Sequence, residues 1–361
     1  MNCYAPWHAL SIRFNGDVVP DCVYEGRHGN LLREDLPTIL RNPGLLSTRR
    51  IIATGEYPSN CIQCTAKECV NGHSRRKFFE QVLNPMLKPE SKGKDDIYFL
   101  EFNMSNVCNL KCRMCSGVNS TAWIKEDLKL QELGIPRPIH EPDFGYRNLS
   151  PDIVDRLFEY PEYFKNLQYV NIKGGEPYME PANKQIMQKL IDLDLAKNIT
   201  LDISTNGTVI DLEFDELAQK FKETKWHISI EGVGKLYEYI RGGANFTFEQ
   251  FEENLKQFDK MDRVIFAGTV MTYNVCHLNE IRSWFESVRK DNYELYLNNV
   301  VTTPAYLNPR ILPTFILEGT GYTEAYDAQN LDKFIEFTVE LDKLRGTNVL
   351  DACPELNTLF S

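Results

Sequence analysis

Short hydrophobic segments rich in β-branched and aromatic residues alternate with longer amphipathic segments from residue 97 onward. The predicted strands are 97–103, 167–173, 199–204, 226–231, 263–271 and 294–301. The predicted helices are 183–196, 214–223, 248–260, 278–290 and, after the last strand, 331–346. Regular alternation of strands and helices is typical of a parallel sheet covered by helices. The pattern therefore predicts an α/β fold with a partial (β/α)6, TIM-like barrel.

The first 77 residues show a different pattern. Apolar runs on both sides of Asn15-Gly16-Asp17 predict a hairpin, because Asn-Gly favours a tight turn. The stretch RNPGLLSTRRIIATG predicts a short helix, and the polar run Lys88–Asp96 predicts a linker. The long connection 121–165 predicts an insertion over one edge of the sheet. The predicted organisation is a small cysteine-rich hairpin domain at 1–90, the barrel at 91–310 and a C-terminal helical segment at 311–361.

The net charge and the hydropathy of the chain argue against nucleic acids and membranes as partners. The net charge of −11 argues against a surface that follows nucleic-acid phosphates, because such surfaces are usually basic. No stretch is apolar for long enough to predict a membrane span, and the N-terminus has no pattern of a secretory signal. We therefore expect a cytoplasmic protein that contacts neither membrane nor nucleic acid.

Most of the cysteines lie near the N-terminus. The chain has 10 cysteines, and the first eight are Cys3, Cys22, Cys61, Cys64, Cys69, Cys108, Cys112 and Cys115. In a reducing compartment, clustered cysteines hold metal more often than they form disulfides. Cys276 and Cys353 stand alone and are assigned no role, since isolated cysteines usually behave as small buried hydrophobic residues.

The segment Cys108-Asn-Leu-Lys-Cys112-Arg-Met-Cys115 has the spacing C-x3-C-x2-C and follows the first barrel strand. Three thiolates within eight residues can bind three irons of a cubic iron–sulfur cluster. A fourth iron would then lack a protein ligand, and an open coordination position is where chemistry occurs. A structural zinc site is the alternative, but it requires four ligands and no fourth one is adjacent.

This three-cysteine loop resembles that of the radical S-adenosylmethionine (radical SAM) superfamily. The resemblance covers residues 97–300 and implies a 4Fe–4S cluster whose open iron is chelated by the amino and carboxylate groups of S-adenosylmethionine. Reductive cleavage would then give a 5′-deoxyadenosyl radical. The superfamily usually places an aromatic residue before the last cysteine, whereas this chain has Met114, whose thioether can also cover an adenine face.

Polar and glycine-rich segments follow the next predicted strands. The resemblance implies that they bind S-adenosylmethionine, since glycines let a ligand approach the backbone and carboxylates accept from an ammonium group. Arg241 matches an arginine that commonly pairs with the methionine carboxylate of the ligand. The other implied contacts are Gly174, Gly175, Glu176, Pro177, Ser204, Asn206, Ser229 and Glu231. For each of them, a turn residue or a surface charge is the alternative.

Cys3, Cys22, Cys61 and Cys64 form a second candidate metal site around the predicted hairpin. The arrangement resembles a twitch domain, which is related to the SPASM domain and holds an auxiliary 4Fe–4S cluster. A zinc ribbon is the alternative, since paired cysteines on a hairpin suit tetrahedral zinc equally well. Cys69 is expected to be a bystander.

The function that these features predict is a radical SAM enzyme that abstracts hydrogen, with a peptide or protein as the leading substrate class. An electron donor such as flavodoxin or ferredoxin would reduce the cluster. The same chemistry on a nucleoside or other small molecule is one alternative. A metal-binding or redox protein that does not cleave S-adenosylmethionine is the other.

Overall fold

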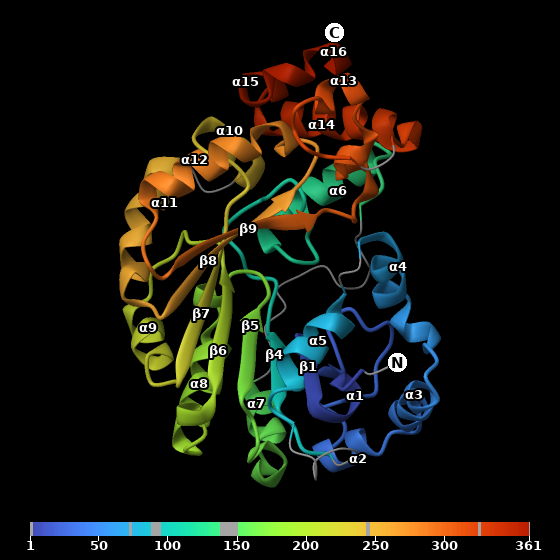
Figure 1. Ribbon diagram of the computed structural model, residues 1–361, viewed down its shortest axis with the longest axis vertical. Helices are drawn as coiled ribbons and strands as arrows, with labels where there is room; N and C mark the ends of the chain where they lie inside the picture. Colours follow the sequence, from blue (N-terminus) through green and yellow to red (C-terminus); the bar gives the residue numbers. More distant parts are fainter. Residues whose placement is uncertain are drawn as a thin grey trace. The chain divides into compact units, whose positions relative to one another are not determined.

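The computed structural model describes residues 3–71, 74–87, 95–137, 151–242, 246–323 and 326–360. The chain forms two compact units. The first contains residues 1–105, 147–203 and 211–224, and the second contains residues 106–146, 204–210 and 225–361. Figure 1 labels the elements of both units. Within the described part of the chain, every helix is too short or too polar to cross a membrane.

The first unit is built on a mixed sheet with the strand order β3-β2-β1-β4-β5-β6. Its strands are β1 (Ala9–Arg13), β2 (Asp17–Val19), β3 (Gly29–Asn30), β4 (Phe99–Asn103), β5 (Tyr169–Lys173) and β6 (Thr200–Thr205). The predicted hairpin is confirmed, because β1 pairs antiparallel with β2. Its first strand also runs parallel to β4, with Ala9 opposite Phe99, so the hairpin continues the main sheet. β4 is buried along four of its five residues, as expected for a parallel strand covered on both faces.

Helices accompany this sheet in the first unit (Figure 1). They are α1 (Ala5–His8), α2 (Leu36–Leu40), α3 (Pro43–Ala53), α4 (Ile62–Asn71), α5 (Arg75–Leu83), α7 (Pro151–Leu157), α8 (Pro181–Asp192) and α9 (Leu212–Ala218). The α3 helix confirms the prediction made from RNPGLLSTRRIIATG, with the Asn42 side chain capping its first turn. Near the N-terminus, Phe79 of α5 packs edge-on against Phe99 of β4, which stacks on Tyr169 of β5. This aromatic cluster fixes α5 to the sheet beside the N-terminal cysteines.

The second unit contains the parallel strands β7 (Glu223–Ser229), β8 (Arg263–Val270) and β9 (Tyr293–Val300), in that order. Its helices are α6 (Ile124–Glu132), α10 (Lys235–Arg241), α11 (Phe248–Asn254), α12 (Leu278–Val288), α13 (Thr314–Leu317), α14 (Leu331–Arg345), α15 (Val349–Ala352) and α16 (Asn357–Phe360). In β9, buried or half-buried positions alternate with exposed ones from Tyr293 to Asn298, as expected of a strand with one solvated face. A large apolar core includes Trp123, Tyr273 and Phe337, and Met114 packs against it.

All six predicted barrel strands are present, and the α/β class is confirmed. The predicted helices occur too, but three of them end at least four residues early. The helix predicted at 183–196 ends at Asp192, and the chain then turns through Asp194 with a positive φ of 58°. The helix predicted at 214–223 ends at Ala218, since β7 already begins at Glu223. The segment 248–260 becomes 3-10 helical from Leu255.

Two predictions fall partly outside the described residues. Residues 88–94 of the predicted linker lie there, and so do residues 138–150 of the predicted insertion at 121–165. The described ends of that connection contain α6 and α7.

Candidate functional site

The three cysteines of the C-x3-C-x2-C motif come together in the irregular loop after β4. Cys112 is buried, and Cys108 and Cys115 are half-buried. A hydrogen bond between the Cys112 and Cys115 thiols lowers the pKa of Cys112 and raises that of Cys115. The negative charge of Cys108 further raises the pKa of Cys115. The three sulfurs therefore act on one another as a single group, as the motif predicts.

Side chains from distant segments bind the backbone carbonyls of this loop. The Trp123 indole donates to the Cys112 carbonyl at 2.8 Å, and the Arg137 guanidinium donates to the Cys115 carbonyl at 2.5 Å. Ser120 and Arg345 bind the carbonyls of Leu110 and Lys111 at 2.6 and 2.7 Å. Because these carbonyls are bound to protein, the backbone of the loop is held in place independently of any metal.

Arg137 is the most constrained of these donors. Its side chain is 1% exposed and forms an ion pair of 2.7 Å with Asp127, which is fully buried. The guanidinium also lies over the ring of Trp123, 4.5 Å from the centroid. Asp127 in turn accepts from the backbone N–H of Gly117 at 2.5 Å. A buried ion pair with this many partners links the loop to the core of the second unit.

Asn206 contacts the cysteine loop directly. Its Nδ2 lies 3.7 Å from the Cys108 sulfur and donates to Asn109 at 3.0 Å. Thr208 donates to the Asn206 carbonyl oxygen from its backbone N–H, at 2.8 Å, which orients the amide group. Sequence reasoning predicted that Asn206 contacts S-adenosylmethionine. In the structure its amide faces a cysteine of the motif, where an N–H donor stabilises a thiolate.

Glu231 and Arg241 form a buried ion pair of 2.8 Å, with side chains 3% and 6% exposed. Burial alone would lower the pKa of Arg241, but the negative charges of Cys112 and Glu231 raise it. The Nε of Arg241 is buried and has no hydrogen-bond partner among the described residues. A buried guanidinium with an unused donor beside the three cysteines fits an anionic ligand at that point.

Other predicted ligand contacts in the second unit occupy less informative positions. Ser204 is half-buried in β6, and the Ser229 hydroxyl donates to the Thr205 carbonyl at 3.4 Å. Met114 is partly buried against the apolar core. After Arg241, the residues from Gly243 to Asn245 lie outside the described part of the chain.

Gly174, Gly175, Glu176 and Pro177 lie at the end of β5 in the first unit. Gly174 has a φ of 121°, and a Cβ there would lie 2.5 Å from the Asn103 side-chain oxygen. The backbone thus requires glycine at this position for packing as well as for any approach of a ligand. Glu176 is 1% exposed, and its carboxylate accepts from the backbone N–H of Tyr178 at 3.3 Å.

The N-terminal cysteines form a second group, in the first unit. Cys3 precedes α1, and Cys61 and Cys64 lie at the start of α4. Burial, together with the charges of Cys61 and Cys64, raises the pKa of Cys3 to about 12. Burial also raises the pKa of Cys64, and backbone N–H groups that donate to the sulfurs of Cys3 and Cys64 offset part of the rise in both. Converging thiols with N–H donors are suited to binding iron or zinc.

Cys22 lies in a strongly charged environment that sequence reasoning missed. Its sulfur is within 4.8 Å of carboxylate oxygens of Asp21 and Glu101. Arg75 bridges these two carboxylates at 2.9 and 2.7 Å, and Lys173 binds Glu101 at 2.7 Å. Burial raises the pKa of Cys22 to about 12, whereas the charge of Lys173 lowers it. The side chain of Cys69 lies outside the described residues.

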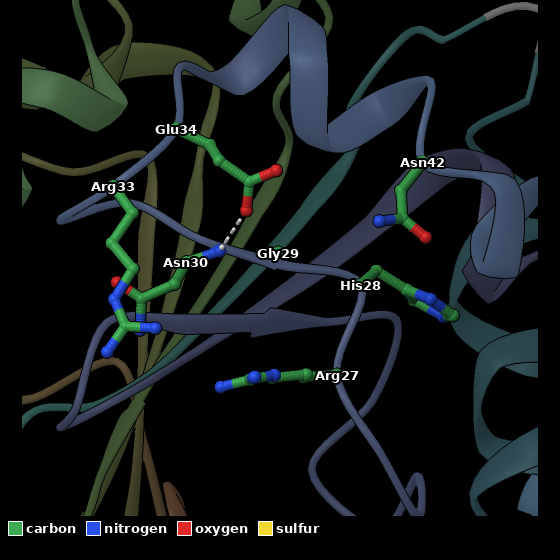
Figure 2. Close-up of a pocket in the computed structure, with 7 residues that line it drawn as sticks. All are labelled: Arg27, His28, Gly29, Asn30, Arg33, Glu34 and Asn42. Carbon is green, nitrogen blue, oxygen red and sulfur yellow. Dashed lines mark hydrogen bonds between the residues drawn. The ribbon is translucent and has the colours of Figure 1, made fainter.

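Figure 2 shows a separate hollow of the first unit, with a volume of about 240 Å³. It is lined by Arg27, His28, Gly29, Asn30, Arg33, Glu34 and Asn42. None of the residues predicted to bind a cofactor lines it, so the cysteine groups remain the candidate sites.

Comparison with known proteins identifies the class of protein. The family model of the radical SAM superfamily matches residues 102–285, and the chain belongs to this superfamily. A second family model, the SPASM iron–sulfur cluster-binding domain, matches residues 3–65. The cofactors are accordingly a 4Fe–4S cluster, S-adenosylmethionine and an auxiliary iron–sulfur cluster. The predicted fold class and domain families are thereby confirmed, and the SPASM match favours iron–sulfur over a zinc ribbon.

Solved structures that match this chain include anSMEcpe with bound AdoMet and the Kp18Cys peptide. It has 17% identity and a TM-score of 0.37, with 70% of this chain and 62% of that chain covered. Another is Streptococcus suis SuiB bound to its precursor peptide SuiA, with 15% identity, a TM-score of 0.40 and coverage of 86% and 64%. This chain thus spans less than two thirds of the length of these proteins. No curated protein sequence matches it.

Proposed function

We propose that this protein is a radical SAM enzyme that abstracts hydrogen from a peptide or protein substrate. Cys108, Cys112 and Cys115 would hold the 4Fe–4S cluster that binds S-adenosylmethionine. When reduced by a donor such as flavodoxin or ferredoxin, that cluster supplies the electron that cleaves S-adenosylmethionine to a 5′-deoxyadenosyl radical.

One observation carries this proposal. The three thiols of the motif act on one another, and the carbonyls of their loop are bound by Ser120, Trp123, Arg137 and Arg345. A loop fixed in this way presents its sulfurs without rearrangement. Three thiolates also suit a cubic cluster that keeps one iron for an exchangeable ligand.

The other predicted site residues of the second unit would bind and orient S-adenosylmethionine. The free Nε of Arg241 suits the carboxylate of the ligand, and Glu231 keeps the guanidinium in position. Asn206 would stabilise the thiolate of Cys108 while Met114 covers the adenine. Ser204 and Ser229 would contact the ribose or sulfonium region. The resemblance to the superfamily supports a contact of the methionine moiety with Gly174, Gly175, Glu176 and Pro177.

The N-terminal cysteines would hold the auxiliary cluster. Cys3, Cys61 and Cys64 act on one another electrostatically, and Cys22 would be the fourth ligand. We propose a functional division into this auxiliary domain at 1–90, the barrel at 91–310 and a helical segment at 311–361. We propose a reducing, cytoplasmic location, because clustered cysteines in such a compartment hold metal more often than they form disulfides.

The activity is tested by anaerobic reconstitution with iron and sulfide, followed by S-adenosylmethionine and dithionite. We expect 5′-deoxyadenosine and methionine in equal amounts, and no product from a Cys112→Ala variant. A fully loaded wild-type protein that forms no 5′-deoxyadenosine would overturn the proposal.

The substrate class is tested with a low-molecular-weight extract that stimulates 5′-deoxyadenosine formation. The combination of a radical SAM domain with an auxiliary cluster supports a peptide, so pretreating the extract with protease should remove the stimulation. Stimulation that survives protease would instead indicate a nucleoside or another small molecule.

A further inference from the structure

A histidine, a cysteine and a glutamate meet in the second unit, and none of the three is a predicted cluster ligand. One ligand atom each from His277, Cys353 and Glu355 lies within 4.8 Å of the other two. Cys353 is fully buried, and the His277 and Glu355 side chains are 14% and 26% exposed. Imidazole nitrogen, thiolate sulfur and carboxylate oxygen are the three ligand types that bind zinc in proteins.

The three residues come from two short segments that the fold brings together. His277 ends a 3-10 turn, Val275–His277, immediately before α12. Cys353 and Glu355 lie at the junction between α15 and the 3-10 turn Pro354–Leu356. Burial against the apolar core that contains Tyr273 and Phe334 fixes Cys353, whose thiol donates to the Tyr273 carbonyl at 3.2 Å. The packing of this core thus fixes the position of the Cys353 sulfur.

Glu280 orients the imidazole from the opposite side. Its carboxylate lies 3.0 Å from Nδ1 of His277, and Glu355 lies 2.9 Å from Nε2. Histidines that bind metals usually donate their second ring N–H to a carboxylate in this way, which directs the other nitrogen to the metal. The arrangement therefore contains an outer carboxylate as well as three ligands.

A comparison within the molecule shows why this group is suited to a cation. Asp21, Cys22 and Glu101 are equally close together, but Arg75 and Lys173 neutralise those carboxylates. Among the described residues, Glu355 forms an ion pair only with His277. When the thiol has lost its proton and the imidazole is neutral, the Cys353 thiolate and the Glu355 carboxylate carry two negative charges. These match the charge of a divalent ion.

From this geometry we propose that His277, Cys353 and Glu355 form a zinc-binding site. Zinc would bind Nε2 of His277, the Cys353 thiolate and the Glu355 carboxylate, with release of the protons on the thiol and the imidazole. A hollow of about 240 Å³ adjoins the group and is lined by Glu355, Cys276 and Glu318. It leaves room for a water at the fourth coordination position. The ion would tie the segment after α15 to the start of α12.

The test uses the full chain with both iron–sulfur clusters loaded, so that iron occupies the cluster cysteines. Zinc alone is added anaerobically in competition with a chromophoric chelator. We expect one zinc ion per chain and a higher melting temperature, reversed by a stronger chelator. A loaded wild-type protein that binds no zinc would overturn the proposal.

Substitutions locate the site. His277→Gln and Glu355→Gln should each weaken zinc binding by at least about 100-fold, and Glu280→Gln by about 10-fold, since it removes only an orienting bond. Glu318→Gln, in the same hollow, is the matched control and should bind zinc normally. Iron content and 5′-deoxyadenosine formation should not change in any of them. Wild-type zinc affinity in both His277→Gln and Glu355→Gln, each folded by circular dichroism, would refute the assignment.

Discussion

The two groups of cluster cysteines are held by different means. The motif cysteines lie within eight residues of one another, and side chains from distant segments bind the carbonyls of their loop. The N-terminal cysteines come from separate segments, and beside Cys22 the cations Arg75 and Lys173 bind carboxylates instead of carbonyls. The first group is thus organised by its own loop, and the second by the packing of the hairpin with α1, α4 and α5.

This difference predicts different roles. A loop fixed at its backbone keeps three thiols in place and leaves one iron for a ligand that exchanges in each turnover. A site assembled from four thiols closes around its metal. Substitutions can separate the two groups.

Removing cysteines should have the largest effect. Cys112→Ala with Cys115→Ala should eliminate one cluster and reduce 5′-deoxyadenosine below detection. Cys61→Ala with Cys64→Ala should eliminate the other cluster but leave cleavage of S-adenosylmethionine by dithionite-reduced protein measurable. Iron analysis and product assay check both. Cys69→Ser, in α4 like Cys64, is the control and should keep both clusters. Equal loss of product in both double variants would contradict the division of roles.

Removal of the Arg137 guanidinium should have the next largest effect, on stability. Arg137→Met leaves Asp127 buried and unpaired and frees the Cys115 carbonyl, so we expect a loss of about 3–5 kcal/mol in the free energy of unfolding. Iron content at the motif should fall with it. Chemical denaturation measures the change. Arg289→Met is the control, because Arg289 is 58% exposed in its ion pair with Glu286 and should change stability by less than about 0.5 kcal/mol.

Asn206→Ala should have a smaller effect, confined to activity. It removes the N–H donor 3.7 Å from the Cys108 sulfur, so iron content should be retained while the rate of 5′-deoxyadenosine formation falls by about 10-fold. A wild-type rate and reduction potential in this variant would show that the contact does not influence the cluster.

The last effect is confined to acidic pH and concerns the stability of the first unit. His28 is 3% exposed, and burial and the charge of Arg49 lower its pKa to about 4 (Figure 2). Between the folded pKa of about 4 and the ordinary pKa of about 6.5, the unfolded chain therefore binds more protons than the folded one. Stability should fall as the pH decreases from about 6.5 to 4, by up to about 1.4 kcal/mol per pH unit.

Denaturation of His28→Phe across this pH range tests that prediction. The variant retains an aromatic ring beside Tyr24, whose ring centroid lies 4.7 Å from that of His28. Its stability should depend less on pH than that of the wild type. An unchanged pH dependence would show that His28 does not contribute.

The strands and the motif loop could be predicted from the sequence because their signals are local. Hydrophobic runs mark β4 to β9, and the cysteine spacing lies within eight residues. Helix ends were less predictable. The residues after Ala218 continue the amphipathic pattern, and the end of α9 depends on where β7 begins. Local periodicity does not contain that information.

Contacts between distant segments could not be predicted. Nothing near Arg137 or Arg345 in the sequence indicates that they bind carbonyls of the cysteine loop. Cys353 stands alone in the sequence, and only the fold places it beside His277. Such contacts depend on tertiary packing, which leaves no periodic or spacing signal.

The central claim is that the cluster held by Cys108, Cys112 and Cys115 has an iron open to S-adenosylmethionine. Electron paramagnetic resonance of the reduced Cys61→Ala/Cys64→Ala protein, recorded with and without S-adenosylmethionine, tests it most directly because only this cluster remains. We predict that adding S-adenosylmethionine shifts the g values of the cluster. An identical spectrum at saturating S-adenosylmethionine would contradict the account.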